Sequence, residues 1–576
     1  MSGSYLSSLA QPFDMVVATT QAAINGTMLE YMAGSDIKAI TLCFVFNEAG
    51  DEQIEVPLAD LKRNPFDIPA NAKRDNADVQ ALAAQGFSCA MMIKPGVPEL
   101  ESGKFPNIIE LGTDASSVKY NMMCSVFKIC QITYGPRSST WKVFEQPANQ
   151  AWGFSSVVDL RLSPLDGAAI SKLPADVQQK IREQNLGASG FSVAQLLFDL
   201  DNAAFQTQPD VHIISSDDPK ASLNDLVVGM VNKRFMGAYW EKQKKDGQPL
   251  FHVAVTSNEP DQSEFRPTSV NRQVCPLVDF QGQPIPYEHL SSTQRDVTTM
   301  NYLCMSFNHP MPAAQKFNWN WLPESDVANY HGVISYNRNS FARWLGTRMI
   351  PQVKESCRPP RVNLPANWRG HVSYDISLED YTQDATLEYP AYQDENSPVL
   401  RFTYNPKEAH DGAGAHNFNH YALAEAILNT SYKCEVFFKG RDITIVQELI
   451  VNLWIEVGKT DWGGDVVHKK LSDTYTLDVD DHGNMETPVP KSVEVDEGQS
   501  PGVNVFEDWF TDINPIINKI KDRARQQTHQ FGQFPIALAQ GFHFPGGKVF
   551  AFKNFQFSKF QDLTAQITYV EPQVMH

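Results

Sequence analysis

Three histidines and one aspartate stand close together in the segment HDGAGAHNFNH, and their side chains are of the types that bind zinc: His410, Asp411, His416 and His420. The spacing fits no known helical or hairpin zinc site, and the glycines between the histidines favour a loop. We therefore predict a polar surface loop here and keep a metal site formed by the three histidines as the weaker alternative. We predict no cofactor.

A second acidic segment, DVDDHGNME, begins like a calcium-binding loop. Asp478, Asp480 and Gly483 occupy three positions of that pattern. The twelfth position needs a bidentate glutamate and instead holds Val489. The segment therefore predicts a hairpin turn and no calcium site.

The sequence contains no catalytic motif. It has no GxSxG nucleophile motif, no P-loop and no GxGxxG motif after a strand. Its 67 acidic residues are spread along the whole chain, so no carboxylate pair stands out for acid–base chemistry. We therefore favour a non-enzymatic function and assign no catalytic residue. An enzyme that uses the three histidines and Asp411 is the weakest alternative.

Tryptophan, tyrosine and asparagine alternate within residues 301–345, most densely in FNWNW. Trp319 and Trp321 could form a stacking platform for a sugar or a base. They could also pack one domain against another, with their N–H groups bonded to amides. Because large aromatic side chains usually pack in the interior, we favour packing.

The composition excludes some classes of function. The 576 residues carry 48 basic and 67 acidic side chains, and the formal net charge of −19 repels nucleic acid. The length predicts two or more domains. The eight cysteines form no CxxC pair, so we expect buried free thiols in a reducing compartment. We find no secretory signal and no apolar run that could span a membrane, which predicts a cytoplasmic location.

Three segments carry apolar residues three and four positions apart and predict long amphipathic helices at 12–32, 222–242 and 504–528. Pro515 suits the start of the third helix or a kink in it. The segment 175–186 predicts a short helix.

Much of the remaining sequence is dense in β-branched and aromatic residues, which favour strands. The predicted strands lie in residues 36–47, 87–93, 121–134, 155–162, 250–255, 371–381, 434–440, 443–458, 473–488, 548–557 and 563–570, and residues 191–203 form a mixed stretch. Polar residues 256–300 and acidic residues 493–502 predict loops or linkers. Long helices set against antiparallel strands give the α+β class.

The segments NYLCMSFNHPMP, FNWNW and GVISYNRNSF together resemble the P-47 proteins, which are encoded beside clostridial neurotoxins. The first predicted helix and the closing segment FPGGKVFAFKNFQFSKFQDLTAQITYV are also similar to that family. The resemblance implies a tubular lipid-binding (TULIP-like) fold, in which a strongly curved antiparallel sheet wraps a long helix and leaves an apolar channel. It carries over no catalytic residue.

On this resemblance we expect two tandem TULIP-like modules, 1–215 and 216–576. The predicted helices would turn their apolar faces toward an elongated groove. The groove candidates are Phe13, Val16, Val17, Ile24, Met28, Tyr31, Leu226, Val227, Met230, Trp509, Ile513, Ile516, Ile517 and Ile520.

The resulting hypothesis is a non-enzymatic protein that binds lipid or another hydrophobic small molecule. The main alternative is an accessory or structural partner of another protein, encoded in a toxin or secondary-metabolite gene cluster. We expect at most weak peripheral membrane contact, since the net charge opposes anionic lipid. Two basic clusters could provide this contact: Lys242, Lys244 and Lys245 in one, and Lys519, Lys521, Arg523 and Arg525 in the other.

Overall fold

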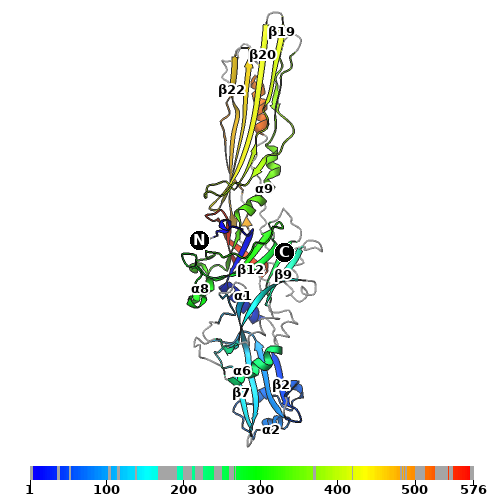
Figure 1. Cartoon of the computed structure of the whole chain (residues 1–576), viewed down its shortest axis with the longest axis vertical. Helices are drawn as coiled ribbons and strands as arrows, with labels where there is room; N and C mark the ends of the chain where they lie inside the picture. Colours follow the sequence, from blue (N-terminus) through cyan, green and yellow to red (C-terminus); the bar gives the residue numbers. More distant parts are fainter. Residues whose placement is uncertain are drawn as a thin grey trace.

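The chain forms an elongated molecule in which three main β-sheets follow one another along the long axis (Figure 1). The computed structural model describes residues 4–34, 39–50, 53–100, 105–112, 117–135, 139–165, 191–198, 210–214, 223, 225–238, 250–257, 265, 267–366, 372–417, 420–458, 460–480, 483, 485–486, 489–499, 513–525, 542–543 and 549–570. The predicted helix at 175–186 lies outside these residues.

A six-stranded antiparallel sheet occupies the middle of the molecule, in the order β12-β13-β1-β14-β28-β27. Its strands come from distant parts of the chain: β1 (Met15–Thr20), β12 (Pro267–Cys275), β13 (Thr299–Ser306), β14 (Gly332–Tyr336), β27 (Val549–Phe557) and β28 (Leu563–Val570). The N-terminal strand β1 is central, with Val17 opposite both Tyr302 and Ile334. The beginning and the end of the described chain are thereby joined in one sheet.

The predicted helix at 12–32 is wrong in its first half. Residues Met15–Thr20 form strand β1, and only Gln21–Gly34 form helix α1. The β-branched residues Val16 and Val17 suit a strand, and the backbone finds hydrogen-bonding partners on both sides in β13 and β14. Tertiary pairing therefore outweighs the helical spacing of the apolar residues.

An eleven-stranded sheet forms one end of the molecule, in the order β26-β11-β9-β8-β6-β4-β2-β3, with β10 on β8 and with β5 and β7 on β6. The bounds are β2 (Ile40–Phe46), β3 (Gln53–Val56), β4 (Phe87–Pro95), β5 (Ile109–Glu110), β6 (Ser117–Tyr134), β7 (Ser139–Glu145), β8 (Trp152–Leu165), β9 (Phe191–Phe198), β10 (Asp210–Ile213), β11 (Leu250–Ser257) and β26 (Phe542–His543). Side chains alternate between its two faces, as in any strand. Helix α2 (Ala77–Ala83) packs on one face.

The other end is a long seven-stranded sheet, in the order β17-β18-β20-β21-β22-β25, with β19 on β20 (Figure 1). The bounds are β17 (Thr386–Glu388), β18 (Leu400–Tyr404), β19 (Ala409–Asn417), β20 (His420–Lys439), β21 (Asp442–Val457), β22 (Thr460–Thr476) and β25 (Lys491–Asp496). Burial alternates residue by residue along the whole of β21, so one face is interior. On the interior side, Ile517 and Ile520 of helix α10 (Ile513–Arg525) are buried.

Two small hairpins and several short helices complete the described chain. The hairpins pair β15 (Pro360–Asn363) with β16 (Asp375–Leu378), and β23 (Asp478–Val479) with β24 (Met485–Glu486). The remaining helical elements are η1 (Leu6–Ser8), η2 (Leu58–Asp60), η3 (Pro65–Asp67), α6 (Asp225–Met230), the π-helical η4 (Val231–Phe235), η5 (Tyr287–His289), α8 (Ser292–Val297), η6 (Glu324–Asp326) and α9 (Arg338–Glu355).

The α+β class and the antiparallel strands are confirmed, and the predicted strands form in the described residues. Two loop predictions are wrong, because residues 256–300 contain β12 and α8 and the acidic segment begins within β25. Each described sheet is open, with two end strands. The wrapping of a sheet around a helix and the division at residue 215 stay predictions.

Candidate functional site

The helix formed by α6 and η4 packs its apolar side on the interior face of the eleven-stranded sheet. Phe235 of η4 stacks on Phe154 of β8, with ring centroids 5.4 Å apart and 16° between the ring planes. Phe154 in turn stacks on Phe127 of β6 at 6.0 Å. Trp152 meets Phe127 edge to face at 5.4 Å. Four aromatic rings thereby connect the helix to two neighbouring strands.

Methionine side chains are frequent in the apolar cluster that contains these rings. Met91 of β4 and Met122 and Met123 of β6 are buried in the same cluster as Met28 of α1 and Met236 after η4. An unbranched thioether side chain can adopt several shapes at little cost, so methionine walls adapt to irregular occupants. The interior is therefore chemically suited to repacking around an apolar guest.

Arg234 lies at the edge of this interior, next to Phe235. Its guanidinium stands over the ring of Phe44 of β2, 4.1 Å from the centroid, and donates to the side-chain amide oxygen of Gln53. A cation over an aromatic face is stabilised by the ring quadrupole. The edge of the apolar region thus carries a fixed positive charge.

Helix α1 is held against strand β5 by two buried polar side chains. The amide of Asn25 accepts from the backbone N–H of Ile109 at 2.8 Å and donates to the carbonyl of the same residue at 2.9 Å. Gln21 accepts from the N–H of Leu111 at 2.6 Å. These bonds pair buried backbone groups of Ile109 in β5 and of Leu111 directly after it, and unpaired buried backbone groups are costly.

The predicted groove residues do not share one face. Val17, Ile24, Met28 and Val227 are buried in the cluster around the aromatic rings, and Met230 packs against it. Phe13 and Val16 are buried in a separate cluster on the opposite side of the central sheet. The single helical face predicted for Phe13 to Met28 is therefore wrong, because the strand β1 turns Val16 and Val17 to opposite sides.

The candidates in the third helix lie at the far end of the same cluster. Ile517 and Ile520 are buried, and Ile516 packs against them. Trp509 lies outside the described residues, as do the side chains of Tyr31, Leu226 and Ile513. The cluster is contiguous from the eleven-stranded to the seven-stranded sheet, so one apolar interior extends along most of the molecule.

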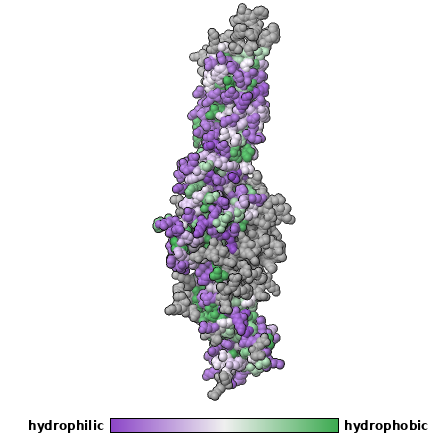
Figure 2. Space-filling view, in the orientation of Figure 1, coloured by the Kyte–Doolittle hydropathy of each residue, from purple (hydrophilic) through white to green (hydrophobic). Residues whose placement is uncertain are grey.

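The surface contrasts with this interior. On the face shown in Figure 2, the described residues are mainly hydrophilic, and hydrophobic residues form small scattered patches. No helix of the described residues is long and apolar enough to cross a membrane.

The aromatic stretch packs in the interior, as predicted. The bonds predicted from its indole N–H groups to amides are wrong, because the Nε1 atoms of Trp319 and Trp321 are buried without a hydrogen-bond partner in the described part of the chain. Trp319 and Trp321 are 4% and 1% exposed and meet edge to face at 5.4 Å. Tyr5 of the N-terminal segment and Phe317 complete the group. The stacking platform for a sugar or base is wrong, and these two tryptophans offer no surface to a protein partner.

The histidine segment is a hairpin and not a loop. His410 and His416 lie on β19, six residues apart along a strand, which separates their Cα atoms by about 20 Å. His410 pairs with Glu425 at 2.6 Å, and Asp411 accepts from the backbone N–H of Leu364 at 2.7 Å. A single metal ion cannot bind both histidines at this separation. The hairpin predicted at DVDDHGNME is confirmed as β23 and β24.

The eight cysteines are free and buried, as predicted. Burial raises the pKa of the Cys43 thiol to about 11 and that of Cys357 to about 12. A thiol that stays protonated is a poor nucleophile. These cysteines therefore contribute to packing.

The basic cluster on α10 faces acidic side chains. Lys519 lies 3.9 Å from the carboxylate of Asp375, and Arg523 donates to Asp380. The cluster at Lys242, Lys244 and Lys245 lies outside the described residues. The ion pairs of Lys519 and Arg523 leave helix α10 less suited to bind anionic lipid than its sequence indicates.

Comparison with known proteins gives solved structures alone, since no family model and no curated protein matches. The chain is similar to P47. It matches P47 from Clostridium botulinum A2 with 8% identity over 96% of each chain and a TM-score of 0.36. It matches P47 of Clostridium botulinum E1 with 10% identity over 96% of this chain and 98% of the other, with a TM-score of 0.38.

A third match is a lipopolysaccharide binding protein, with 10% identity, 98% of this chain and all of the other chain covered, and a TM-score of 0.28. The resemblance to the P-47 proteins that the sequence indicates is also found among solved structures.

The aromatic residues of the interior were absent from the sequence prediction. Phe127, Phe154 and Phe235 come from three separate elements, and only the tertiary fold brings them together. The alternation within CSVFKIC already indicated that Phe127 and Ile129 share a strand face. It could not indicate that a helix would cover that face.

Proposed function

We propose that this protein is a non-enzymatic carrier of a lipid or another long apolar molecule, which lies between the α6–η4 helix and the eleven-stranded sheet. The observation that supports the proposal most strongly is the contiguous apolar interior, walled by methionine and aromatic side chains beneath a helix. In this proposal the acyl chain takes the place of contacts that Phe235 and the methionines now make with one another.

The α6–η4 helix has the features of an element that can shift. Its second part is π-helical, and π-helical turns in proteins are frequently found at functional sites. Gly229 and Gly237 stand on either side of η4 with open space around them. Glycine is the residue with the greatest backbone freedom, so a change of helix direction would meet least resistance there.

Arg234 would bind the acidic end of the ligand. It stands at the edge of the apolar region, where a carboxylate or phosphate could remain partly hydrated while the chain lies inside. Each methylene moved from water into the interior contributes about 0.8 kcal/mol. Chain length would therefore determine affinity more strongly than the identity of the head group.

Native mass spectrometry and fatty-acid binding test the proposal. We expect the purified protein to carry extractable lipid, and we expect each added methylene to tighten binding about fourfold, as about 0.8 kcal/mol requires. Met91→Phe, on the interior face of β4, should weaken binding. Met92→Phe, one residue away on the opposite face, is the matched control. An affinity that does not change with chain length would contradict the proposal.

One observation favours a second function, the binding of another protein. Phe280 is 95% exposed at the tip of a tight turn. Asp279 holds the turn by accepting from the N–H groups of Gln281 and Gln283 at 2.8 and 2.9 Å. A photo-crosslinking residue placed at 280 should yield one adduct of defined mass in the source cell. Crosslinking only to solvent, or to many proteins equally, would contradict this function.

A further inference from the structure

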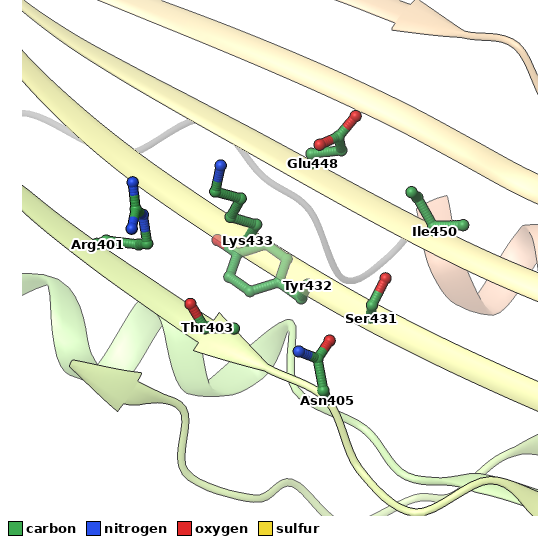
Figure 3. A pocket seen from close by; sticks show the side chains of 8 residues that line it. All are labelled: Arg401, Thr403, Asn405, Ser431, Tyr432, Lys433, Glu448 and Ile450. Atoms are coloured by element: carbon green, nitrogen blue, oxygen red, sulfur yellow. The ribbon is translucent and has the colours of Figure 1, made fainter. Parts of the chain in front are cut away.

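A hollow of about 420 Å³ lies on the outer face of the seven-stranded sheet, away from the apolar interior. Figure 3 shows that side chains from three adjacent strands surround it. Small ligands commonly bind in hollows of roughly 300–1,000 Å³. The lining residues are Arg401, Thr403, Asn405, Ser431, Tyr432, Lys433, Glu448 and Ile450.

The hollow exists because short side chains stand among long ones. In the strand register, Thr403 lies opposite Lys433, and Ser431 lies opposite Ile450. The ring of Tyr432 belongs to the other face, where its hydroxyl donates to Gln447 at 2.8 Å. The floor between Arg401, Lys433 and Ile450 is therefore formed by hydroxyl-bearing residues and backbone.

Two cations at the hollow share a single carboxylate. Arg401 donates through Nε to Glu435 Oε1 at 2.8 Å, and Lys433 Nζ lies 2.9 Å from Glu435 Oε2. Burial alone would raise the pKa of Glu435, but the bonds from Lys433 and Arg401 outweigh it and lower the pKa. The carboxylate is therefore ionised at neutral pH, and the trio retains one net positive charge.

Glu448 is the carboxylate of the lining, and in the strand register it lies directly opposite Lys433 of β20. Glu448 accepts from His468 Nε2 at 3.1 Å, and it lies directly opposite Lys470 in the strand register. Glu448 thus has a lysine opposite it on each neighbouring strand, Lys433 on β20 and Lys470 on β22.

Three polar side chains of the lining have no protein partner. Thr403, Asn405 and Ser431 make no side-chain hydrogen bond within the described chain, and neither does one terminal nitrogen of Arg401. Hydroxyl, amide, guanidinium and ammonium donors from separate strands thus surround one volume. Bonds from charged donors to an anion are roughly twice as strong as neutral ones, and Arg suits oxyanions in particular.

We propose that this hollow binds a phosphate monoester group. Arg401 and Lys433 would hold the phosphate oxygens, Thr403 and Ser431 would donate their hydroxyls from the floor, and Ile450 would contact the organic part of the ligand. The donors come from two adjacent strands, β18 and β20, and the three oxygens of a phosphate monoester can accept from several of them at once. The proposal is independent of the apolar interior, because the hollow and the interior lie on opposite faces of the sheet.

Isothermal titration with glycerol 1-phosphate tests this site on the full chain. We expect saturable binding that Arg401→Gln combined with Lys433→Gln weakens at least tenfold. Thr403→Val keeps the shape of the side chain and removes one donor, so it should weaken binding a few-fold. Lys439→Gln is the matched control, because Lys439 lies on the same strand and face, about 20 Å from Lys433.

Vesicles of phosphatidylcholine with and without phosphatidic acid separate a lipid head group from a soluble ester. Binding to the acidic vesicles that the double substitution abolishes assigns the site to a lipid phosphate. Binding to glycerol 1-phosphate alone assigns it to a soluble ester. Equal affinities of the unchanged protein and the double variant for glycerol 1-phosphate, or an equal loss in Lys439→Gln, would overturn the proposal.

Discussion

Phe154 and Phe235 stack with 16° between their rings and join the α6–η4 helix to the sheet beneath it. This contact lies at the centre of the interior that we propose for an apolar ligand. It also has a measurable effect on stability.

We expect Phe235→Ala to lower the free energy of unfolding by about 3–5 kcal/mol, since a buried phenyl group is lost and a cavity remains. Denaturant titration measures the change. Phe280→Ala is the control with the same substitution at a 95% exposed position, where a change within about 0.5 kcal/mol is expected. Equal effects at the two positions would mean that the helix is not packed on the sheet.

Stability should depend on the protonation of Asp562. Burial raises the pKa of this fully buried carboxyl from 3.8 to about 6, although it accepts bonds from Ser7 and from the backbone N–H of Arg338. The folded state therefore binds the proton more tightly than the unfolded state. Stability is greatest below about pH 4 as far as this group is concerned, and it falls as the pH rises through about 6.

The loss should amount to about 3 kcal/mol, as two pKa units require. Asp562→Asn removes the titrating group, so the difference between its free energy of unfolding and that of the unchanged protein should vary with pH over this window. A constant difference from pH 4 to pH 7 would contradict the assignment.

The buried guanidinium of Arg338 connects three parts of the chain. It donates to Gln561 at 2.8 Å and to the carbonyl oxygens of Pro390 and Pro398 at 3.0 Å. Arg338→Met would leave these acceptors unpaired in the interior, which costs about 1–3 kcal/mol for each group. We expect a loss of at least about 3 kcal/mol in thermal or denaturant unfolding.

The control is Arg361→Met, which removes an exposed ion pair with Asp375. Exposed pairs contribute about 0–1 kcal/mol. A similar small loss in Arg338→Met would show that water replaces the guanidinium at no cost.

The cysteines should be unreactive in the native state. Burial raises the pKa of Cys130 and Cys275 to about 12, so their thiolate forms are scarce at pH 8. We expect Ellman's reagent to react slowly with the folded protein and to detect all eight thiols after denaturation. Rapid reaction of one or more native thiols would identify a cysteine outside the packed core.

The strands could be predicted well from the sequence because period-two alternation is local, as in β21. The strand in residues 12–32 could not be predicted, because the spacing of its apolar residues is compatible with a helix and with a strand. Pairing with β13 and β14 decides between the two. Helix α9 was missed although Asn337 caps it by accepting from the N–H groups of Asn339 and Ser340. The density of aromatic residues there indicated packing and obscured the cap.

Only the apolar character of the candidate site could be predicted from the sequence, and the contacts between its residues could not. The apolar residues Ile24, Met28 and Val227 were identified, and they are buried in one apolar cluster. Their place in a ligand groove stays a prediction. The aromatic contact of Phe154 with Phe235 joins residues 81 positions apart, and no local pattern encodes such a pair. The polar hollow was not predicted, because Arg401, Lys433 and Glu448 are ordinary outward-facing residues of three separate strands.

Fluorescence quenching by 9,10-dibromostearic acid tests the proposed ligand site most directly. Trp152 contacts Phe127 in the interior, whereas Trp141 contacts Phe87 in the cluster on the opposite face of the same sheet. We predict that the brominated fatty acid quenches part of the tryptophan emission, that Trp152→Phe removes this part, and that Trp141→Phe leaves it unchanged. Quenching that survives in Trp152→Phe, or that is absent in the unchanged protein, would contradict an apolar ligand between the α6–η4 helix and the sheet.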